Sequence, residues 1–109
     1  MSLEIIPVKI QKEIKSDDDL ADLVLESSEI DDYDIIVFSQ KIVSKSEGRI
    51  LSLSSINPSL LANGIADSYG KDPRLVELIL SESKKILRME NGVIIVETKH
   101  GFVCANAGI

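Results

Sequence analysis

Residues 72–105 decide the fold, and they read DPRLVELILSESKKILRMENGVIIVETKHGFVCA. Their first half predicts a helix from Pro73 to about Leu87, because Asp72 supplies a capping side chain and proline suits the first helical position. Five residues of this helix recur three or four positions apart, and four of them are apolar: Val76, Ile79, Leu80, Ser83 and Leu87. The spacing predicts an amphipathic helix with one face packed against a core.

The second half of this stretch predicts a pair of strands. Asn91-Gly92 is a tight-turn dipeptide, and the residues after it, 93–96, form a short apolar run. A further strand is expected over 102–105, after a glycine-containing turn at 99–101. A helix followed by paired strands favours a mixed α/β architecture.

Three more strands are expected upstream. Residues 3–10 are apolar on both faces of a two-residue period, which is typical of a strand covered on both sides. Residues 35–38 (IIVF) form a continuous apolar run that predicts a buried central strand, and residues 49–53 alternate in the manner of another strand.

Helix signals separate these strands. The polar run 16–19 predicts a helix start, residues 39–47 predict a short helix that Gly48 ends, and Asn57-Pro58 is a second capping signal followed by proline. The expected fold class is α/β, with a mixed sheet and about four helices.

The composition excludes several classes of function. Eighteen acidic against twelve basic residues give a net charge of -6, which disfavours nucleic acid as a partner. One cysteine and one histidine can form neither an internal disulfide nor a structural zinc site. The sequence contains no apolar run of membrane-spanning length and no export signal, so no membrane partner and a cytoplasmic location are expected.

Residues 39–49 (SQKIVSKSEGR) are the most informative for chemistry. They place a hydroxyl, an amide and two ammonium groups where a strand is expected to end and a helix to begin, the usual position of a ligand crevice. Lys41 and Lys45 stand four residues apart on one helix face, so an anion between them would relieve their repulsion. The alternative is two solvated lysines, paired with Glu47 or another acidic neighbour. The segment is not a P-loop, because the glycine spacing of that motif is missing.

No other group of residues predicts chemistry. His100 is expected in an exposed turn, and Cys104 is expected to behave as a small buried apolar residue. The acidic runs 17–19 and 31–32 are expected to be solvated rather than to hold a cation. Residues 106–108 would suit either a close approach of the backbone to a ligand or tight packing.

Three segments carry a family signal: residues 39–49 (SQKIVSKSEGR), 70–77 (GKDPRLVE) and 100–108 (HGFVCANAG). In this order they resemble the amino-terminal part of the coenzyme F420:L-glutamate ligase family. The resemblance runs from near residue 1 to residue 109, and its first and third segments are long and unusual.

The resemblance implies a GTP-dependent amide ligase that adds L-glutamate to coenzyme F420-0 in coenzyme F420 biosynthesis. The reaction is expected to pass through an acyl phosphate and to need Mg²⁺ or Mn²⁺, with K⁺ as a further candidate ion. GTP, F420-0 and L-glutamate are the expected partners, and the full-length enzyme is expected to be a homodimer. The resemblance identifies no catalytic residue. Carried over by position, the expected GTP-binding residues are Gln11, Lys12, Glu13, Ile14, Gln40, Lys41 and Lys45.

Residues 106–109 mark the limit of the resemblance. In the family the corresponding segment runs into a metal-binding aspartate, so no metal ligand is expected within residues 1–109. We therefore expect this chain to be the amino-terminal part of the ligase domain, cut before its first metal-binding aspartate and inactive by itself.

Two alternatives stay open. The chain could be a non-catalytic module of the same fold that binds a nucleotide or mediates oligomerisation. It could also belong to a longer protein in which a flavin-dependent reductase follows the ligase. Sequence beyond residue 109 would distinguish them, because an aspartate and a serine–asparagine pair there would support the ligase.

Overall fold

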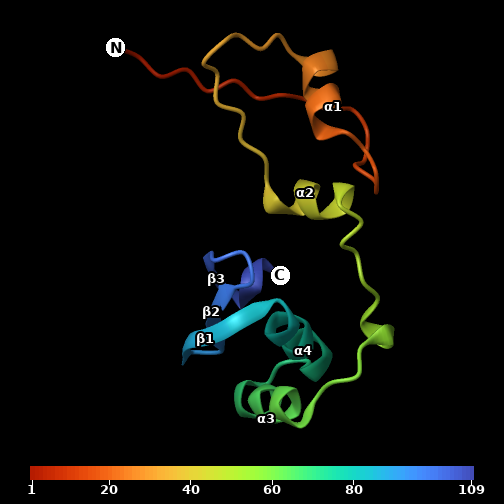
Figure 1. The fold of residues 1–109 in the computed structure, drawn as a ribbon, viewed down its shortest axis with the longest axis vertical. Coiled ribbons are helices and arrows are strands. Elements are labelled where there is room, and N and C mark those ends of the chain that lie inside the picture. Colours follow the sequence, from red (N-terminus) through yellow and green to blue (C-terminus); the bar gives the residue numbers. More distant parts are fainter. The chain divides into compact units, whose positions relative to one another are not determined.

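The computed structural model describes all residues from Met1 to Ile109, as four α-helices, two 3₁₀ helices and one three-stranded sheet. The predicted α/β class and the four helices are confirmed (Figure 1). The sheet is antiparallel throughout. The chain forms two compact units, residues 1–50 and residues 51–109.

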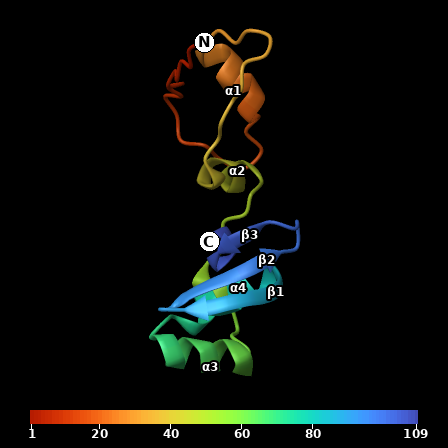
Figure 2. The same ribbon diagram turned by 90° about the vertical axis from the view of Figure 1, so that its left-hand side faces the viewer.

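The second unit contains two helices followed by the sheet. Its elements are α3 (Leu60–Tyr69), α4 (Pro73–Ser81), β1 (Ser83–Glu90), β2 (Val93–Thr98) and β3 (Val103–Ala105). The strand order is β1-β2-β3, so β2 is central. α4 lies beside the sheet and α3 packs against α4 (Figures 1 and 2).

The core of this unit is made by α3, α4 and the inner face of β2. Every second residue of β2 from Ile94 onward is buried, as expected for a strand with one face against a core. Fully burying one Val or Ile side chain contributes about 1.5–3 kcal/mol, so this cluster stabilises the unit. Its members are Ala62, Ile65, Ala66, Val76, Ile79, Ile94 and Val96.

The starts of α3 and α4 are fixed by side-chain caps. The Asp72 carboxylate accepts a hydrogen bond from the Arg74 amide at 2.9 Å, and Pro73 opens α4, as predicted. The start predicted at Asn57-Pro58 is wrong by two residues, because the Ser59 side chain caps α3. The Glu77 carboxylate on α4 accepts a hydrogen bond from the Ser59 amide at 2.9 Å. This bond links the two helices and favours Ser59 as the capping residue of α3.

The helix predicted over 73–87 is shorter than expected. α4 ends at Ser81, and the chain then forms β1, which pairs with β2 across the Asn91-Gly92 turn. Residues 83–87 continue the helical spacing in the sequence, but ladder hydrogen bonds to β2 outweigh that local preference. The predicted strands 93–96 and 102–105 correspond to β2 and β3.

The segment after β3 packs against the core of the second unit. Residues Asn106–Gly108 form a 3₁₀ turn, and the Asn106 side-chain oxygen accepts a hydrogen bond from the Ile94 amide at 3.2 Å. Ala107 packs against the core cluster. Packing is one of the two alternatives stated for residues 106–108. Cys104 on β3 is half-buried, and His100 lies exposed in the turn before this strand.

The first unit contains two short helices, α1 (Leu20–Ser27) and α2 (Gln40–Ser46). The Asp19 carboxylate accepts from the Asp22 amide at 3.1 Å, so the helix start predicted at residues 16–19 is confirmed. Only Ile14 and Val24 are buried in this unit.

The strands predicted over 3–10, 35–38 and 49–53 are wrong. These residues form no strand, and Ile35 and Val37 are 89% and 86% exposed. A strand needs a partner for its backbone N–H and C=O groups, and no segment of this chain pairs with them. The apolar composition of these three segments therefore led to a wrong prediction of strands. Part of the third segment lies in a 3₁₀ turn over Leu53–Ser55.

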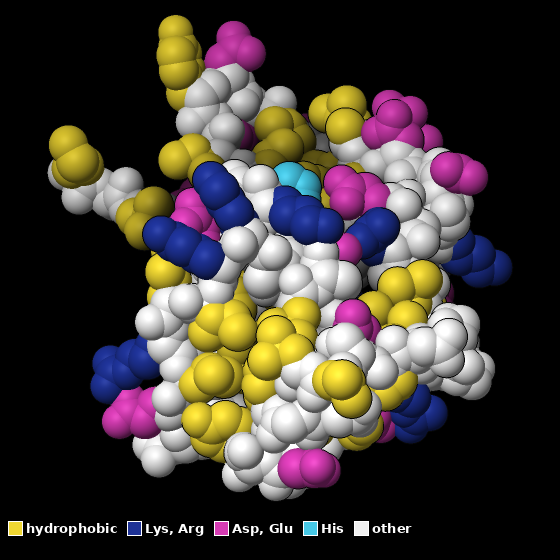
Figure 3. All heavy atoms as spheres, turned by 60° about the horizontal axis from the view of Figure 1, so that its bottom comes forward, with side chains coloured by type: hydrophobic (Ala, Val, Ile, Leu, Met, Phe, Trp, Pro, Cys, Tyr) yellow, Lys and Arg dark blue, Asp and Glu magenta, His cyan; other side chains and the backbone are white.

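The surface retains apolar side chains. Figure 3 shows a group of them on the face that it draws. In the second unit the large exposed apolar residues include Leu60, Leu61, Phe102 and Val103. None of the helices has the length and apolar content needed to cross a membrane.

Candidate functional site

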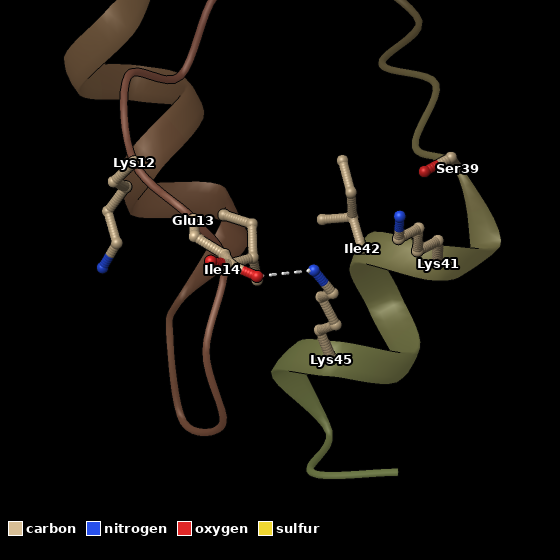
Figure 4. Close-up of a pocket in the computed structure, with 7 residues that line it drawn as sticks. All are labelled: Lys12, Glu13, Ile14, Ser39, Lys41, Ile42 and Lys45. Carbon is tan, nitrogen blue, oxygen red and sulfur yellow. Dashed lines mark hydrogen bonds and ion pairs between the residues drawn. The ribbon is translucent and has the colours of Figure 1, made fainter. Parts of the chain in front are cut away.

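A solvent-facing pocket of about 380 Å³ lies in the first unit, between residues 12–14 and α2. Three ammonium groups and one carboxylate provide its charges, and two isoleucines provide its apolar part (Figure 4). Three lysines and one glutamate give the lining a net charge of +2, within a chain whose net charge is -6. The lining residues are Lys12, Glu13, Ile14, Ser39, Lys41, Ile42 and Lys45.

One wall of the pocket is α2, whose C-terminal end is well defined. The Arg49 amide donates to the Ser44 carbonyl at 2.8 Å and the Gly48 amide donates to the Lys45 carbonyl at 3.1 Å. This pair of bonds is a Schellman motif, and it needs the left-handed conformation that Gly48 adopts at φ 68°. The predicted helix stop at Gly48 is therefore confirmed.

The other wall is the loop before α1, which polar contacts hold against α2. The Asp17 amide donates to the Ser46 carbonyl at 3.0 Å. A Cβ on Gly48 would lie 2.8 Å from the Ser16 hydroxyl oxygen, so the loop passes close to the end of α2. The Asp18 carboxylate accepts from the Lys15 amide at 2.7 Å and closes the turn. The sequence thus positions residues 12–14 beside α2.

An ion pair joins the two walls. The Lys45 ammonium nitrogen lies 3.1 Å from Oε1 of Glu13, as the dashed line in Figure 4 shows. The hydrogen bond and charge of Lys45 lower the pKa of the Glu13 carboxyl, and the charges of Lys15 and Lys41 act in the same direction. Glu13 is therefore ionised at neutral pH.

The three lysines of the pocket differ in their partners. The Lys12 ammonium lies 2.9 Å from Oδ1 of Asp18, and this bond is the main cause that lowers the pKa of Asp18. Lys45 is paired with Glu13. The ammonium of Lys41 makes neither a hydrogen bond nor an ion pair, and its side chain is exposed. Lys41 is thus available to an incoming anion.

This arrangement can bind an anion with several phosphate groups. Each ammonium group offers three donors, and Lys41 and Lys45 lie one turn apart on the same helix face. Positive groups gathered at one place attract an anion even when the net charge of the protein is negative. The expected alternative, in which acidic neighbours pair the lysines, holds for Lys45 in this structure, although its partner is Glu13 rather than Glu47.

The pocket brings together five of the seven residues that the sequence predicted for GTP. Lys12, Glu13 and Ile14 come from the loop, and Lys41 and Lys45 come from α2. Gln11 and Gln40 do not line it. The site does not lie at the end of a strand, since residues 35–38 form none.

Two lining residues, Ser39 and Ile42, were not among the predicted site residues. The Ser39 hydroxyl precedes α2 but makes no capping hydrogen bond, so it is free to face a ligand. Ser39 is adjacent to Gln40, a predicted GTP-binding residue, and this adjacency is the sequence feature that could have identified it. Nothing in the local sequence distinguished Ile42 from an ordinary apolar helix residue.

The residues present do not fit a divalent cation. No group of three or more His, Cys, Asp or Glu side chains converges anywhere in the structure. A protein site for Mg²⁺ needs oxygen ligands in near-octahedral geometry, and the pocket offers the single carboxylate of Glu13, already paired with Lys45.

Comparison with known proteins gives a consistent family relationship. Residues 8–109 match the family described as F420-0:gamma-glutamyl ligase. The chain is 44% identical over 108 residues to a coenzyme F420:L-glutamate ligase from Methanopyrus kandleri, covering 99% of this chain and 43% of that protein. It is 46% identical over 114 residues to a protein of that name from Methanothermobacter thermautotrophicus, covering 100% of this chain and 45% of the relative.

A third relative shows the same partial coverage. A coenzyme F420:L-glutamate ligase from Archaeoglobus fulgidus is 39% identical over 109 residues, with 100% of this chain and 43% of that protein aligned. The chain thus spans less than half the length of these curated relatives.

Proposed function

Since the chain belongs to the F420-0:gamma-glutamyl ligase family, we propose that it is part of an enzyme that adds L-glutamate to coenzyme F420-0. Within that enzyme, the pocket between residues 12–14 and α2 binds the phosphate groups of GTP. The observation that supports this role is the pocket itself, which is lined by Lys41 and Lys45 from α2 and by Lys12 and Glu13 from the loop. Lining residues from 12–14 and from 39–45 are 25 or more positions apart in the sequence, so the pocket exists only in the folded chain.

The proposed reaction forms one amide bond in two steps. A carboxylate oxygen of F420-0 attacks the terminal phosphorus of GTP, the bond to the bridging oxygen breaks, and GDP leaves. The amine of L-glutamate then attacks the carbonyl carbon of the acyl phosphate, loses a proton and expels inorganic phosphate. Both steps involve anionic reactants, so positive groups that neutralise and orient the phosphates stabilise the transition state.

Lys41 and Lys45 supply that positive charge in this chain. An ammonium group near the terminal phosphates would stabilise the charge that gathers on the bridging oxygen as GDP leaves. We assign no step to a cation held by residues 1–109, because their acidic side chains do not converge. We propose that the whole protein acts in the cytoplasm, and the family resemblance suggests that it does so as a homodimer.

The test is GTP binding to wild type and to Lys45→Ala, measured by calorimetry. We expect binding at least tenfold weaker in the variant, which corresponds to roughly 1.4 kcal/mol and suits the loss of a charge-assisted hydrogen bond. Lys9→Ala is the matched control, since Lys9 is an exposed lysine of the same unit outside the pocket. Equal affinity of wild type and Lys45→Ala, or an equal loss in Lys9→Ala, would contradict the proposal.

A further inference from the structure

We propose that Glu13 is an internal counterion of the pocket, whose carboxylate occupies Lys45 until a polyphosphate displaces it. This inference rests on the proposed function, because it concerns the same lysine. It assigns the Glu13 side chain a role that opposes ligand binding, although the residue lies within the binding pocket.

The geometry shows where the carboxylate sits. Its Oε1 lies 3.1 Å from the Lys45 ammonium nitrogen, at hydrogen-bond distance. A phosphate oxygen that accepts from the same donor of that ammonium would occupy a similar position. The carboxylate and a phosphate therefore compete for Lys45 in the pocket that Figure 4 shows.

Exposure makes this carboxylate the mobile partner. The Glu13 side chain is 75% exposed, whereas that of Lys45 is 23% exposed. The Glu13 carboxylate makes no hydrogen bond except the one to Lys45, so it can turn into water without leaving another donor unpaired. Exposed ion pairs contribute little to stability, and this pair can break without unfolding the loop.

Asp18, the other carboxylate paired with a pocket lysine, is a contrasting case. It accepts hydrogen bonds from both the Lys12 ammonium and the Lys15 amide, and the second bond closes the loop. Removing Asp18 would therefore disturb the backbone that positions Glu13. The bond to the Lys15 amide keeps the Asp18 carboxylate in the turn even when Lys12 turns away, whereas the bond to Lys45 is the one hydrogen bond of the Glu13 carboxylate.

The charges decide which ligands can displace Glu13. A carboxylate carries one negative charge, whereas a terminal phosphate carries nearly two and offers three strong acceptor oxygens. An anion that approaches Lys41 and Lys45 meets the repulsion of Glu13 until the carboxylate moves away. Removing this charge should strengthen binding, which is the opposite of the result expected for a residue that contacts the ligand favourably.

The experiment measures binding of inorganic tripolyphosphate to the full chain by calorimetry at low ionic strength. The proteins are wild type, Glu13→Gln, Lys45→Ala and the double variant Glu13→Gln/Lys45→Ala. Glu26→Gln is the matched control, because Glu26 is an exposed residue of α1 and its loss changes the net charge of the same unit equally. Tripolyphosphate carries no base, so the readout reports on the phosphate site alone.

We expect Glu13→Gln to bind tripolyphosphate at least fivefold more tightly than wild type, and Glu26→Gln to change affinity less than twofold. In the Lys45→Ala background the gain from Glu13→Gln should be much smaller, since the carboxylate then has no lysine for which to compete with the ligand. Unchanged or weaker binding by Glu13→Gln, or an equal gain with and without Lys45, overturns the counterion role. In that case a loss of affinity in Lys45→Ala would leave the proposed function intact. If wild type binds no tripolyphosphate, or Lys45→Ala binds it equally well, the proposed function fails and the counterion role fails with it.

Discussion

The two units of this chain are stabilised in different ways. Residues 51–109 bury a cluster of seven apolar side chains, whereas residues 1–50 bury only Ile14 and Val24 and leave Leu3, Ile5, Ile35 and Val37 more than four-fifths exposed. The contacts identified around the pocket of the first unit are mainly helix caps, loop hydrogen bonds and ion pairs. The unit with fewer buried apolar side chains therefore carries the candidate site.

Charge separates the units as clearly as burial does. Residues 1–50 hold twelve acidic and six basic residues, and residues 51–109 hold six of each, so the first unit accounts for the whole net charge of -6. Three of its six basic residues line the pocket: Lys12, Lys41 and Lys45. An acidic unit that gathers cations at one place can bind an anion locally and repel it elsewhere.

The largest expected effect comes from the core of the second unit. Ile79 is 1% exposed and belongs to the seven-residue cluster, so Ile79→Ala should lower the free energy of unfolding by about 2–5 kcal/mol. Urea unfolding followed by the amide NMR signals of β2 measures this change. Leu25→Ala removes a side chain that is 64% exposed on α1 and should change the stability of the first unit by less than about 0.5 kcal/mol. Similar losses of unfolding free energy in both variants would contradict the difference in core burial between the two units.

A smaller effect on stability is expected at acidic pH. The hydrogen bonds from the Arg74 side chain and amide lower the pKa of the Asp72 carboxyl from 3.8 to about 2. A depressed carboxyl pKa adds stability that is fully present above pH 3.8 and is lost as the pH falls through about 2. In Arg74→Ala the pKa of Asp72, followed by carboxyl NMR, should rise toward 3.8 without reaching it, since the backbone amide still donates. Arg88→Ala is the control, and an Asp72 pKa that stays at about 2 in Arg74→Ala would show that Arg74 is not its cause.

Local signals predicted much of the second unit from its sequence. Asp72-Pro73 marks the start of α4, and Asn91-Gly92 marks the turn before β2, because capping and turn chemistry involve neighbouring residues. The strand β1 could not be predicted in the same way. Residues 83–87 continue a helical spacing, and only pairing with β2 makes them a strand.

The same distinction applies to the site. Lys41 and Lys45 share one face of α2, and their four-residue spacing predicted this directly. The contact between Glu13 and Lys45 spans 32 residues, so no local pattern could predict it. The buried strand expected at residues 35–38 is absent because no strand of this chain pairs with it. The four-residue spacing thus identified the two lysines correctly. The prediction that they follow the end of a strand was wrong.

The most direct test of the proposed phosphate site is an NMR titration of the wild-type chain with GTP, which follows the backbone amides of both units. We expect shifts to concentrate on residues 12–14 and 39–45, while the amides of α4 and β2 stay unchanged. Shifts confined to residues 51–109, or spread evenly over both units without a maximum at the pocket, would contradict it.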